Sequence, residues 1–250
     1  MKKIVFIGDS ITDMKRNREC SDHPSSYGFS HVFLTEAFLS TNYPHEYELV
    51  NKGISGSRIV DVYARIKSDV WNENPEYVVV LIGINDIWHE IYNQNGVDIK
   101  RFINIYKMMI EETLERLPNV KFIIMEPFFL EGKETIENID KFKEIYTYSD
   151  KIRIMCCERD IPFIPLQVKL DKLGKVNGND YYLYDGVHPT ICGSEVISSS
   201  FLETLFPHPT NILVPIATTP NKTTNFFIIL SSSQIINQQY YNIFVNKKED

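Results

Sequence analysis

Residues 77–82, Tyr-Val-Val-Val-Leu-Ile, decide the fold class of this 250-residue chain. The run is mostly β-branched and carries no charge, which is typical of a strand covered on both faces of a parallel sheet. Weaker candidates for strands occupy residues 4–7, 47–51, 120–125 and 161–164. The chain therefore contains five candidate strands, and the central one is predicted to be fully buried.

Helical patterns lie between and after these strands. Residues 98–117 place apolar side chains at helical spacing, and Pro118 follows the predicted end. Residues 136–159 and 191–206 are interpreted as two further amphipathic helices, and residues 166–184 as a loop. Alternating strands and helices predict an α/β fold with a parallel sheet and helices on both faces. In such folds ligands bind outside the carboxyl ends of the strands, so chemistry is expected directly after each strand.

Composition excludes several classes of protein. The chain is 43% hydrophobic and 24% charged, as ordinary globular proteins are, which excludes disordered and fibrous classes. A net charge of −7 without a basic stretch argues against a nucleic-acid partner. The apolar run before Gly8 is too short for a secretory signal, and no run approaches the roughly 20 residues of a membrane span. The four cysteines lack the spacing of a zinc site. We therefore expect a cytoplasmic protein with no membrane partner and no metal.

The composition changes after Phe206. Between Pro207 and Asn246 the only formal charge is Lys222, while Asn, Gln, Thr, Ser and Ile are frequent. Strand-like pieces occupy residues 212–217, 225–231 and 240–245. We expect one α/β domain over residues 1–206 and a low-charge extension over 207–250. A β-ribbon, an oligomer contact and a poorly ordered tail all remain open for the extension.

A serine and a histidine stand where catalysis is expected. The first strand ends in Gly8-Asp9-Ser10, and a serine hydroxyl becomes a good nucleophile only when a base takes its proton. Of the six histidines, His188 has a carboxylate three residues earlier, Asp185, which is a spacing that lets a carboxylate orient an imidazole. A single Asp-x-x-His motif more often has no catalytic role, so its interpretation depends on which other sequence motifs accompany it.

Two further blocks follow the second and third strands. Gly53 and Gly56 lie in the loop after residue 51, where a glycine lets a backbone N–H approach a developing oxyanion. Asn85 follows Gly83 and offers a side-chain N–H for the same purpose. Taken singly, each block is more often a turn or a loop cap. Together, Ser, Gly, Asn and His follow successive strands in that order.

This order resembles the SGNH hydrolases, also called the GDSL esterases. The resemblance covers the core from residue 8 to residue 189, and residues 6–13, 51–56, 82–88 and 127–132 are similar to bacterial SGNH acetylxylan esterases and related carbohydrate deacetylases. It implies a three-layer α/β/α fold with a five-stranded parallel sheet of flavodoxin-like order. The implied roles are Ser10 as nucleophile, His188 as base, Asp185 as its partner, Asp9 as a structural anchor, and the Ser10 N–H, the Gly56 N–H and the Asn85 side chain as oxyanion donors. One departure is Ser57, where these relatives usually have Asn, and the extension has no counterpart.

The resemblance implies a serine esterase that removes a short acyl group, most readily acetate, from a carbohydrate, without a cofactor. The expected partner is a small-molecule or oligosaccharide ester, and a homo-oligomer remains open. Trp88, Tyr27 and Phe128 are the candidate walls of a substrate pocket, against the alternative that they are ordinary packing residues. The alternative functions are a general short-chain esterase, lysophospholipase or thioesterase of the same family, and a metal-dependent phosphoesterase, for which the chain lacks the usual Asp-x-His pattern.

Overall fold

Five parallel strands form the sheet in the computed structural model, which describes residues 1–21, 23–206, 214–215 and 227–228. The strand order is β2-β1-β3-β4-β5. The bounds are Lys2–Gly8 for β1, Tyr47–Asn51 for β2, Tyr77–Leu81 for β3, Lys121–Met125 for β4 and Phe163–Ile164 for β5. The prediction of a five-stranded parallel sheet with flavodoxin-like order is confirmed.

The hydrophobic run that decided the fold class occupies the centre of the sheet. From Val78 to Leu81 no residue of β3 is more than 2% exposed, and Ile4 to Ile7 of β1 are equally buried. In the ladder, Gly8 pairs with Leu81, so both strands end at the same level. On the other side of β1, Phe6 pairs with Asn51 at the end of β2. The segments after these three strands therefore meet at one edge of the sheet.

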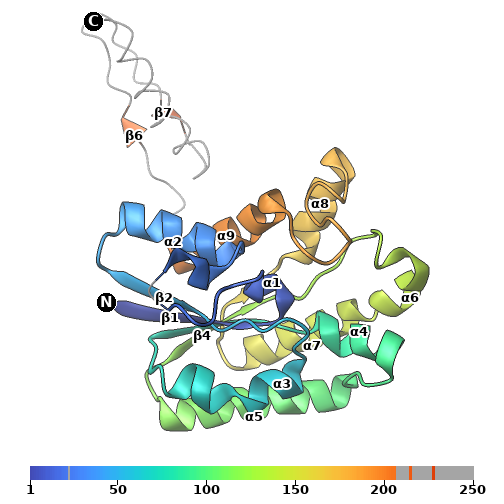
Figure 1. Cartoon of the computed structure of the whole chain (residues 1–250), viewed down its shortest axis with the longest axis horizontal. Coiled ribbons are helices and arrows are strands. Elements are labelled where there is room, and N and C mark those ends of the chain that lie inside the picture. The colour runs from blue at the N-terminus through green and yellow to red at the C-terminus, as the bar shows by residue number, and fades with distance from the viewer. Residues whose placement is uncertain (22, 207–213, 216–226, 229–250) are drawn as a thin grey trace, which may run out of the picture. The chain divides into compact units, whose positions relative to one another are not determined.

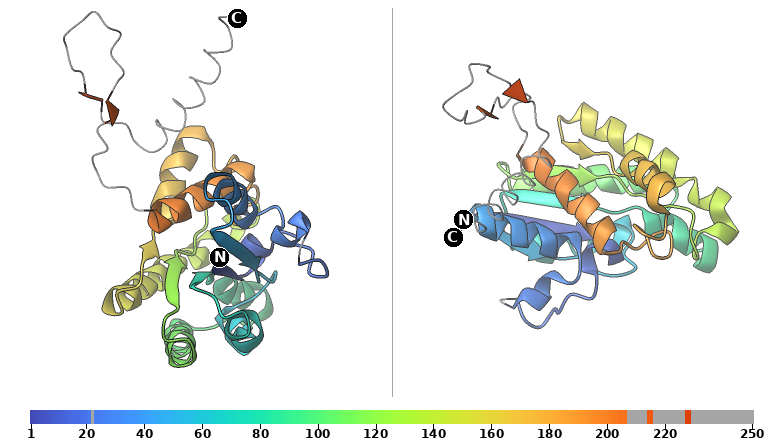
Figure 2. Two further views of the ribbon diagram at one scale, coloured as in Figure 1. Left: turned by 90° about the vertical axis from the view of Figure 1, so that its left-hand side faces the viewer. Right: turned by 90° about the horizontal axis from the view of Figure 1, so that it is seen from above.

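Helices cover both faces and make three layers (Figures 1 and 2). On one face lie α3 (Ile59–Ala64), α5 (Ile99–Arg116) and α7 (Ile145–Glu158), and on the other lie α2 (His31–Asn42) and α9 (Ile191–Leu205). The other helical elements are α1 (Ser10–Asp13), η1 (Pro24–Tyr27), the π-helix η2 (Lys67–Trp71), α4 (Ile84–Asn93), η3 (Ile136–Asn138), α6 (Ile139–Phe142) and α8 (Gln167–Asn177).

The structure confirms some of the predicted helices and corrects others. The helix expected over 98–117 is confirmed as α5, and the Asp98 carboxylate caps it by accepting the Arg101 N–H at 3.0 Å. The single helix expected over 136–159 is wrong, because the chain turns between α6 and α7 after two short helical pieces. The expected loop 166–184 is wrong in its first half, where α8 forms. Gly174 lies inside this helix and lets it pack closely on the next segment, since a Cβ there would lie 2.3 Å from Asn179 Oδ1.

The chain divides into two units, Met1–Thr204 and Leu205–Asp250. In the second unit, Val214–Pro215 (β6) and Phe227–Ile228 (β7) pair as antiparallel strands, at two of the three places where strand-like pieces were predicted. The third piece, at 240–245, lies outside the described residues.

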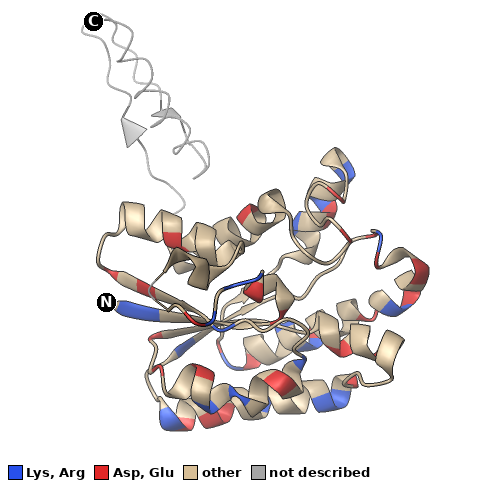
Figure 3. Ribbon diagram, in the orientation of Figure 1, with Lys and Arg blue, Asp and Glu red and all other residues tan. Residues whose placement is uncertain are grey.

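Charges are mixed over the surface of the first unit. Figure 3 shows Lys and Arg interspersed with Asp and Glu along the helices. Several of these charges form ion pairs one turn apart, as Arg153 does with Asp150 and Lys143 with Asp140. Within the described ranges no helix is long and apolar enough to cross a membrane.

Candidate active site

The predicted serine, histidine and aspartate are hydrogen-bonded in series. Ser10 Oγ lies 2.8 Å from His188 Nε2, and His188 Nδ1 lies 2.6 Å from Asp185 Oδ2. Ser10 comes from the first turn after β1, whereas His188 lies 178 residues later in the chain. A base at hydrogen-bond distance from a hydroxyl, itself oriented by a carboxylate, is the arrangement that activates a serine for nucleophilic attack.

The loop that carries Asp185 and His188 is fixed by its own backbone and by the segment after β4. Tyr184 N–H donates to His188 O at 3.0 Å, which closes a tight turn around Gly186. Gly186 has φ +99°, and a Cβ there would lie 2.7 Å from Leu130 O, so the turn requires glycine. Leu130 N–H donates to Gly186 O at 2.8 Å and anchors the loop beside the sheet.

Asp185 is well supplied with donors. Its Oδ1 accepts the N–H groups of Val187 at 2.9 Å and His188 at 2.7 Å, while Oδ2 faces the imidazole. Burial favours the neutral acid, but the hydrogen bonds from His188 and Val187 outweigh it and lower the pKa of Asp185. The carboxylate is therefore ionised at neutral pH.

The pKa of His188 is shifted in the opposite direction, upward. Burial alone lowers its pKa, but the hydrogen bond and charge of Asp185, with smaller contributions from the charges of Asp9 and Glu134, raise the pKa of His188 above its ordinary value of 6.5. A more basic imidazole accepts a proton from a hydroxyl more readily. Glu134 was missed by the sequence analysis, because only the folded chain brings it near His188.

The three predicted oxyanion donors are the Ser10 N–H, the Gly56 N–H and the Asn85 side chain. Ser10 N–H and Gly56 N–H have no acceptor among the described residues. Gly56 has φ +79°, and the nearest atom to a Cβ there would be His89 Nε2, at 3.9 Å. Asn85 is 6% exposed and donates one N–H of its side chain to Ser57 O at 3.2 Å. A primary amide has two N–H donors, so Asn85 keeps a second one for another acceptor.

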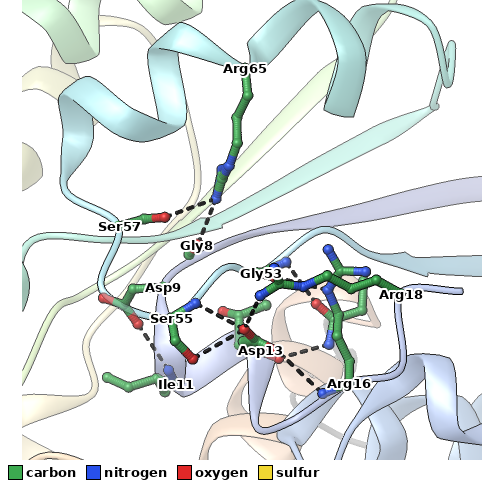
Figure 4. A network of polar contacts seen from close by, with 12 residues as sticks. Gly8, Asp9, Ile11, Asp13, Arg16, Arg18, Gly53, Ser55, Ser57 and Arg65 are labelled. Carbon is green, nitrogen blue, oxygen red and sulfur yellow. Dashed lines mark hydrogen bonds and ion pairs between the residues drawn. The ribbon is translucent and has the colours of Figure 1, made fainter.

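Ser57, the departure from the resemblance, takes part in a buried polar contact. Arg65 of α3 donates from Nη2 to Gly8 O at 2.9 Å and lies 3.3 Å from Ser57 Oγ (Figure 4). The guanidinium thereby links the end of β1 to the loop after β2. Ser57 is 4% exposed, so its side chain supports this loop from inside the protein.

Two buried carboxylates anchor the segments that carry Ser10 and Asn85. Asp9 Oδ1 accepts the Ile11 N–H at 2.9 Å and caps α1, and burial raises the pKa of Asp9 to about 7. Asp86 accepts the Ile59 N–H at 3.1 Å and ties α4 to the start of α3, and burial raises its pKa well above the ordinary value. Both are 1% exposed. Asp9 thus occupies the anchoring position that the resemblance implied.

Comparisons with known proteins agree with this geometry. Residues 6–196 match the GDSL-like Lipase/Acylhydrolase family. The chain belongs to this family. It is 31% identical over 207 residues to an acetylxylan esterase of Geobacillus stearothermophilus, covering 80% of this chain and 92% of the relative. The crystal structure of Axe2, an acetylxylan esterase from G. stearothermophilus, has a TM-score of 0.72 and 28% identity, and the alignment covers 81% of this chain and 93% of that one. A GDSL-like lipase structure from Parabacteroides merdae gives 0.75 and 27%, covering 81% and 94%.

As a member of the GDSL-like family, the protein is a carboxylic ester hydrolase. Residues 207–250 lie beyond the family match. Among the described residues no group of three or more His, Cys, Asp or Glu side chains is placed to hold a metal ion.

The aromatic residues predicted to wall the pocket of this esterase differ in their positions. The Trp88 ring is half-buried and lies 5.9 Å from the His188 ring between centroids. Phe128 is fully buried, so its ring has no surface to offer a substrate in this structure. Tyr27 is the last residue of η1, and its backbone O accepts a side-chain N–H of Asn51, at the end of β2, at 2.9 Å. Of the three, the described structure brings only Trp88 into ring contact with His188.

Tyr184 also makes a ring contact with His188. Its ring stacks on His188 at 5.8 Å with an interplanar angle of 18°, and the residue is 56% exposed. The sequence analysis included Tyr184 only as the last residue of the segment 166–184, which precedes Asp185 and could shape the site. Its place directly before Asp185 in the sequence was the available signal for this contact.

Proposed function

We propose that this carboxylic ester hydrolase cleaves short acyl esters of carbohydrates, acetyl esters above all, through a Ser10–His188–Asp185 triad and an acyl-enzyme. The observation that carries the proposal is the continuous hydrogen-bonded series from Ser10 Oγ to Asp185 Oδ2. Two variants of Axe2, one with a serine and one with an aspartate replaced by alanine, are described as catalytic mutants, which supports the same residue types here.

The chemistry follows from the atoms in contact. Ser10 Oγ attacks the acyl carbon as its proton passes to His188 Nε2, and Asp185 stabilises the imidazolium that results. The carbonyl oxygen becomes an oxyanion, which accepts hydrogen bonds from the N–H groups of Ser10, Gly56 and the Asn85 side chain. Collapse breaks the ester bond, and the leaving alkoxide takes the proton from Nε2. Water, deprotonated by His188 Nε2, then attacks the acyl carbon of the acyl-enzyme. The bond from that carbon to Ser10 Oγ breaks, Oγ takes the proton back from Nε2, and the acid is released.

The substrate class rests on the relatives and on the aromatic rings beside the base. One structural neighbour is described as an acetyl-xylooligosaccharide esterase. Trp88 and Tyr184 flank His188, and exposed aromatic faces bind the apolar faces of sugar rings. We propose an acetylated oligosaccharide as substrate. The four cysteines are all unpaired, which fits the reducing cytoplasm that we propose for the protein.

The test is acetate release from acetylated xylo-oligosaccharides, beside aryl acetate, butyrate and octanoate esters and with EDTA added. Ser10→Ala is compared with Ser68→Ala, a change at an exposed serine whose hydroxyl bonds only near its own turn. We expect acetate release that resists EDTA, vanishes in Ser10→Ala and persists in Ser68→Ala. Cleavage of only the longer aryl esters would leave the proposed triad intact but refute the proposed carbohydrate substrate. Activity that survives Ser10→Ala and dies with EDTA would refute the triad itself.

A further inference from the structure

Asp13 connects the serine segment to the loop that carries Gly56. It is the last residue of α1, the short helix that begins at Ser10, and its side chain is only 4% exposed. Its Oδ2 accepts the Ser55 N–H at 2.9 Å and the Ser55 hydroxyl at 3.1 Å (Figure 4). Ser55 directly precedes Gly56. One buried carboxylate therefore holds the residue next to a candidate oxyanion donor, and does so from the helix that supplies another.

Neighbouring contacts seat the same loop on α1. Arg16 Nε donates to Gly53 O at 2.8 Å, and a Cβ on Gly53 would lie 2.4 Å from Asp13 N, so the loop packs directly on the helix backbone. Arg18 Nη2 donates to Asp13 Oδ2 at 2.7 Å from a side chain that is half exposed. Burial opposes ionisation of Asp13, but the hydrogen bonds from Ser55 and Arg18 prevail and lower its pKa. The acceptor is thus a carboxylate at neutral pH, and charge-assisted hydrogen bonds are the strong ones.

We propose that Asp13 is a positioning residue, which fixes the Gly56 N–H relative to the Ser10 N–H so that both donors reach one oxyanion. Asp13 touches neither substrate nor the reacting atoms, and it acts through Ser55. Oxyanion stabilisation depends on donors that are already aligned before charge develops, so a loop that drifts reduces the rate without weakening ground-state binding. The inference rests on the proposed serine mechanism.

The alternative is that Asp13 only stabilises the fold. A structural role would lower the free energy of unfolding but leave kcat of the folded enzyme unchanged. Asp98 provides the matched control, because its carboxylate also accepts a backbone N–H, that of Arg101 at 3.0 Å, and also pairs with an arginine side chain, 3.7 Å from Arg101 Nε, but it caps α5 and not the serine segment. Asp98→Asn removes a comparable charge and a comparable ion pair.

The experiment measures kcat and KM for an aryl acetate, and the affinity for phenylboronic acid, in Asp13→Ala, Asp13→Asn and Asp98→Asn. Phenylboronic acid binds a serine nucleophile as a tetrahedral anion and reports on the oxyanion donors. Removing one such donor typically costs about 10²–10³ in kcat, so we expect Asp13→Ala to lose about 10² with KM changed less than about twofold. The affinity for phenylboronic acid falls by a similar factor. Asp13→Asn has kcat and affinity between those of Asp13→Ala and the unmodified enzyme, and Asp98→Asn stays within about twofold of the unmodified enzyme.

Urea unfolding and near-ultraviolet circular dichroism confirm that each variant is folded at the assay temperature. If Asp13→Ala does not fold, Asp13→Asn carries the same comparison. Unchanged kcat and boronate affinity in a folded Asp13 variant would overturn the positioning role, whatever happens to the unfolding midpoint. Failure of the serine mechanism would show separately, as activity in Ser10→Ala and no binding of phenylboronic acid by the unmodified protein.

Discussion

Replacing Asp185 by asparagine tests how the carboxylate acts on the base. Asparagine has the same shape, and its one carbonyl oxygen can still accept the Val187 and His188 N–H groups that Oδ1 accepts now, at 2.9 and 2.7 Å. The amide nitrogen then faces His188 Nδ1, where Oδ2 now lies at 2.6 Å. An amide nitrogen only donates, so Nδ1 must become the acceptor and the ring proton moves to Nε2. That tautomer points a proton at Ser10 and cannot take one.

The magnitude follows from this change of tautomer. Flipping the amide would rescue the tautomer but would set its N–H groups against two backbone N–H donors, which loses two hydrogen bonds at a buried site. We therefore expect kcat/KM for an aryl acetate to fall by about 10⁴, or roughly 5 kcal/mol in the barrier. The Asp185 charge also raises the pKa of His188, so the acid limb of the pH–rate profile lies above pH 6.5 in the unmodified enzyme and moves to lower pH in the variant.

The assay is a pH–rate profile of Asp185→Asn beside the matched control Glu134→Gln. Glu134 raises the pKa of His188 through its charge and not through a hydrogen bond to the ring, so Glu134→Gln lowers the midpoint of the acid limb slightly and leaves the rate at the plateau within about twofold. A loss of less than tenfold in folded Asp185→Asn, with the midpoint unmoved, would refute the tautomer argument.

Three further outcomes are expected. Asn85→Ala removes a buried side-chain donor and lowers kcat about 10²–10³-fold with little change in KM; equal kcat in steady-state assays would exclude Asn85 from the oxyanion site. Trp88→Ala raises KM for an acetylated oligosaccharide about tenfold, as loss of roughly 1.4 kcal/mol of ring contact would, but changes KM for an aryl acetate less; parallel changes in both would contradict a sugar contact. His31 is fully buried and burial lowers its pKa to about 3, so the unfolded chain takes up a proton below pH 6.5 that the native chain does not. Between pH 6.5 and 4.5 the free energy of unfolding of the unmodified protein therefore falls by about 2–3 kcal/mol more than that of His31→Leu. If urea titrations show that the free energies of unfolding of the two proteins fall equally over this range, His31 is protonated in the folded state.

The sequence predicts best what is fixed locally. The β-branched run of β3, the glycines that end strands and the spacing from Asp185 to His188 are properties of short segments, and each lies in the structure where it was expected. The same local interpretation failed for residues 167–177, where α8 forms in place of the expected loop and Gly174 packs closely against Asn179. It also failed for the single helix over 136–159, since hydrophobic periodicity continues across the turn between α6 and α7.

Contacts between distant segments account for what the sequence could not predict. The Asp13 carboxylate meets Ser55, 42 residues later, and nothing in either segment identifies the partner. Phe128 follows a strand, as a pocket residue should, but burial depends on which helices pack over it. Predicting such roles requires knowing which strand ends are neighbours, and therefore the strand order itself.

The strand order also divides the site into two halves of different origin. The serine and all three candidate oxyanion donors come from the first 85 residues, after adjacent strands β1, β2 and β3, whereas His188 arrives after the last strand. The base is held in place by its loop against Leu130 and by α9, which begins just after it and packs on α2 through Thr35 and Ser198, whose hydroxyls lie 2.9 Å apart in the buried interior. Loosening the α2–α9 contact would therefore move the base away from Ser10 while leaving the donors aligned, and loosening the Asp13–Ser55 contact would do the reverse. The two kinds of damage are separable, because the first raises the barrier to proton transfer and shifts the pH–rate profile, and the second weakens binding of a tetrahedral anion without moving the profile.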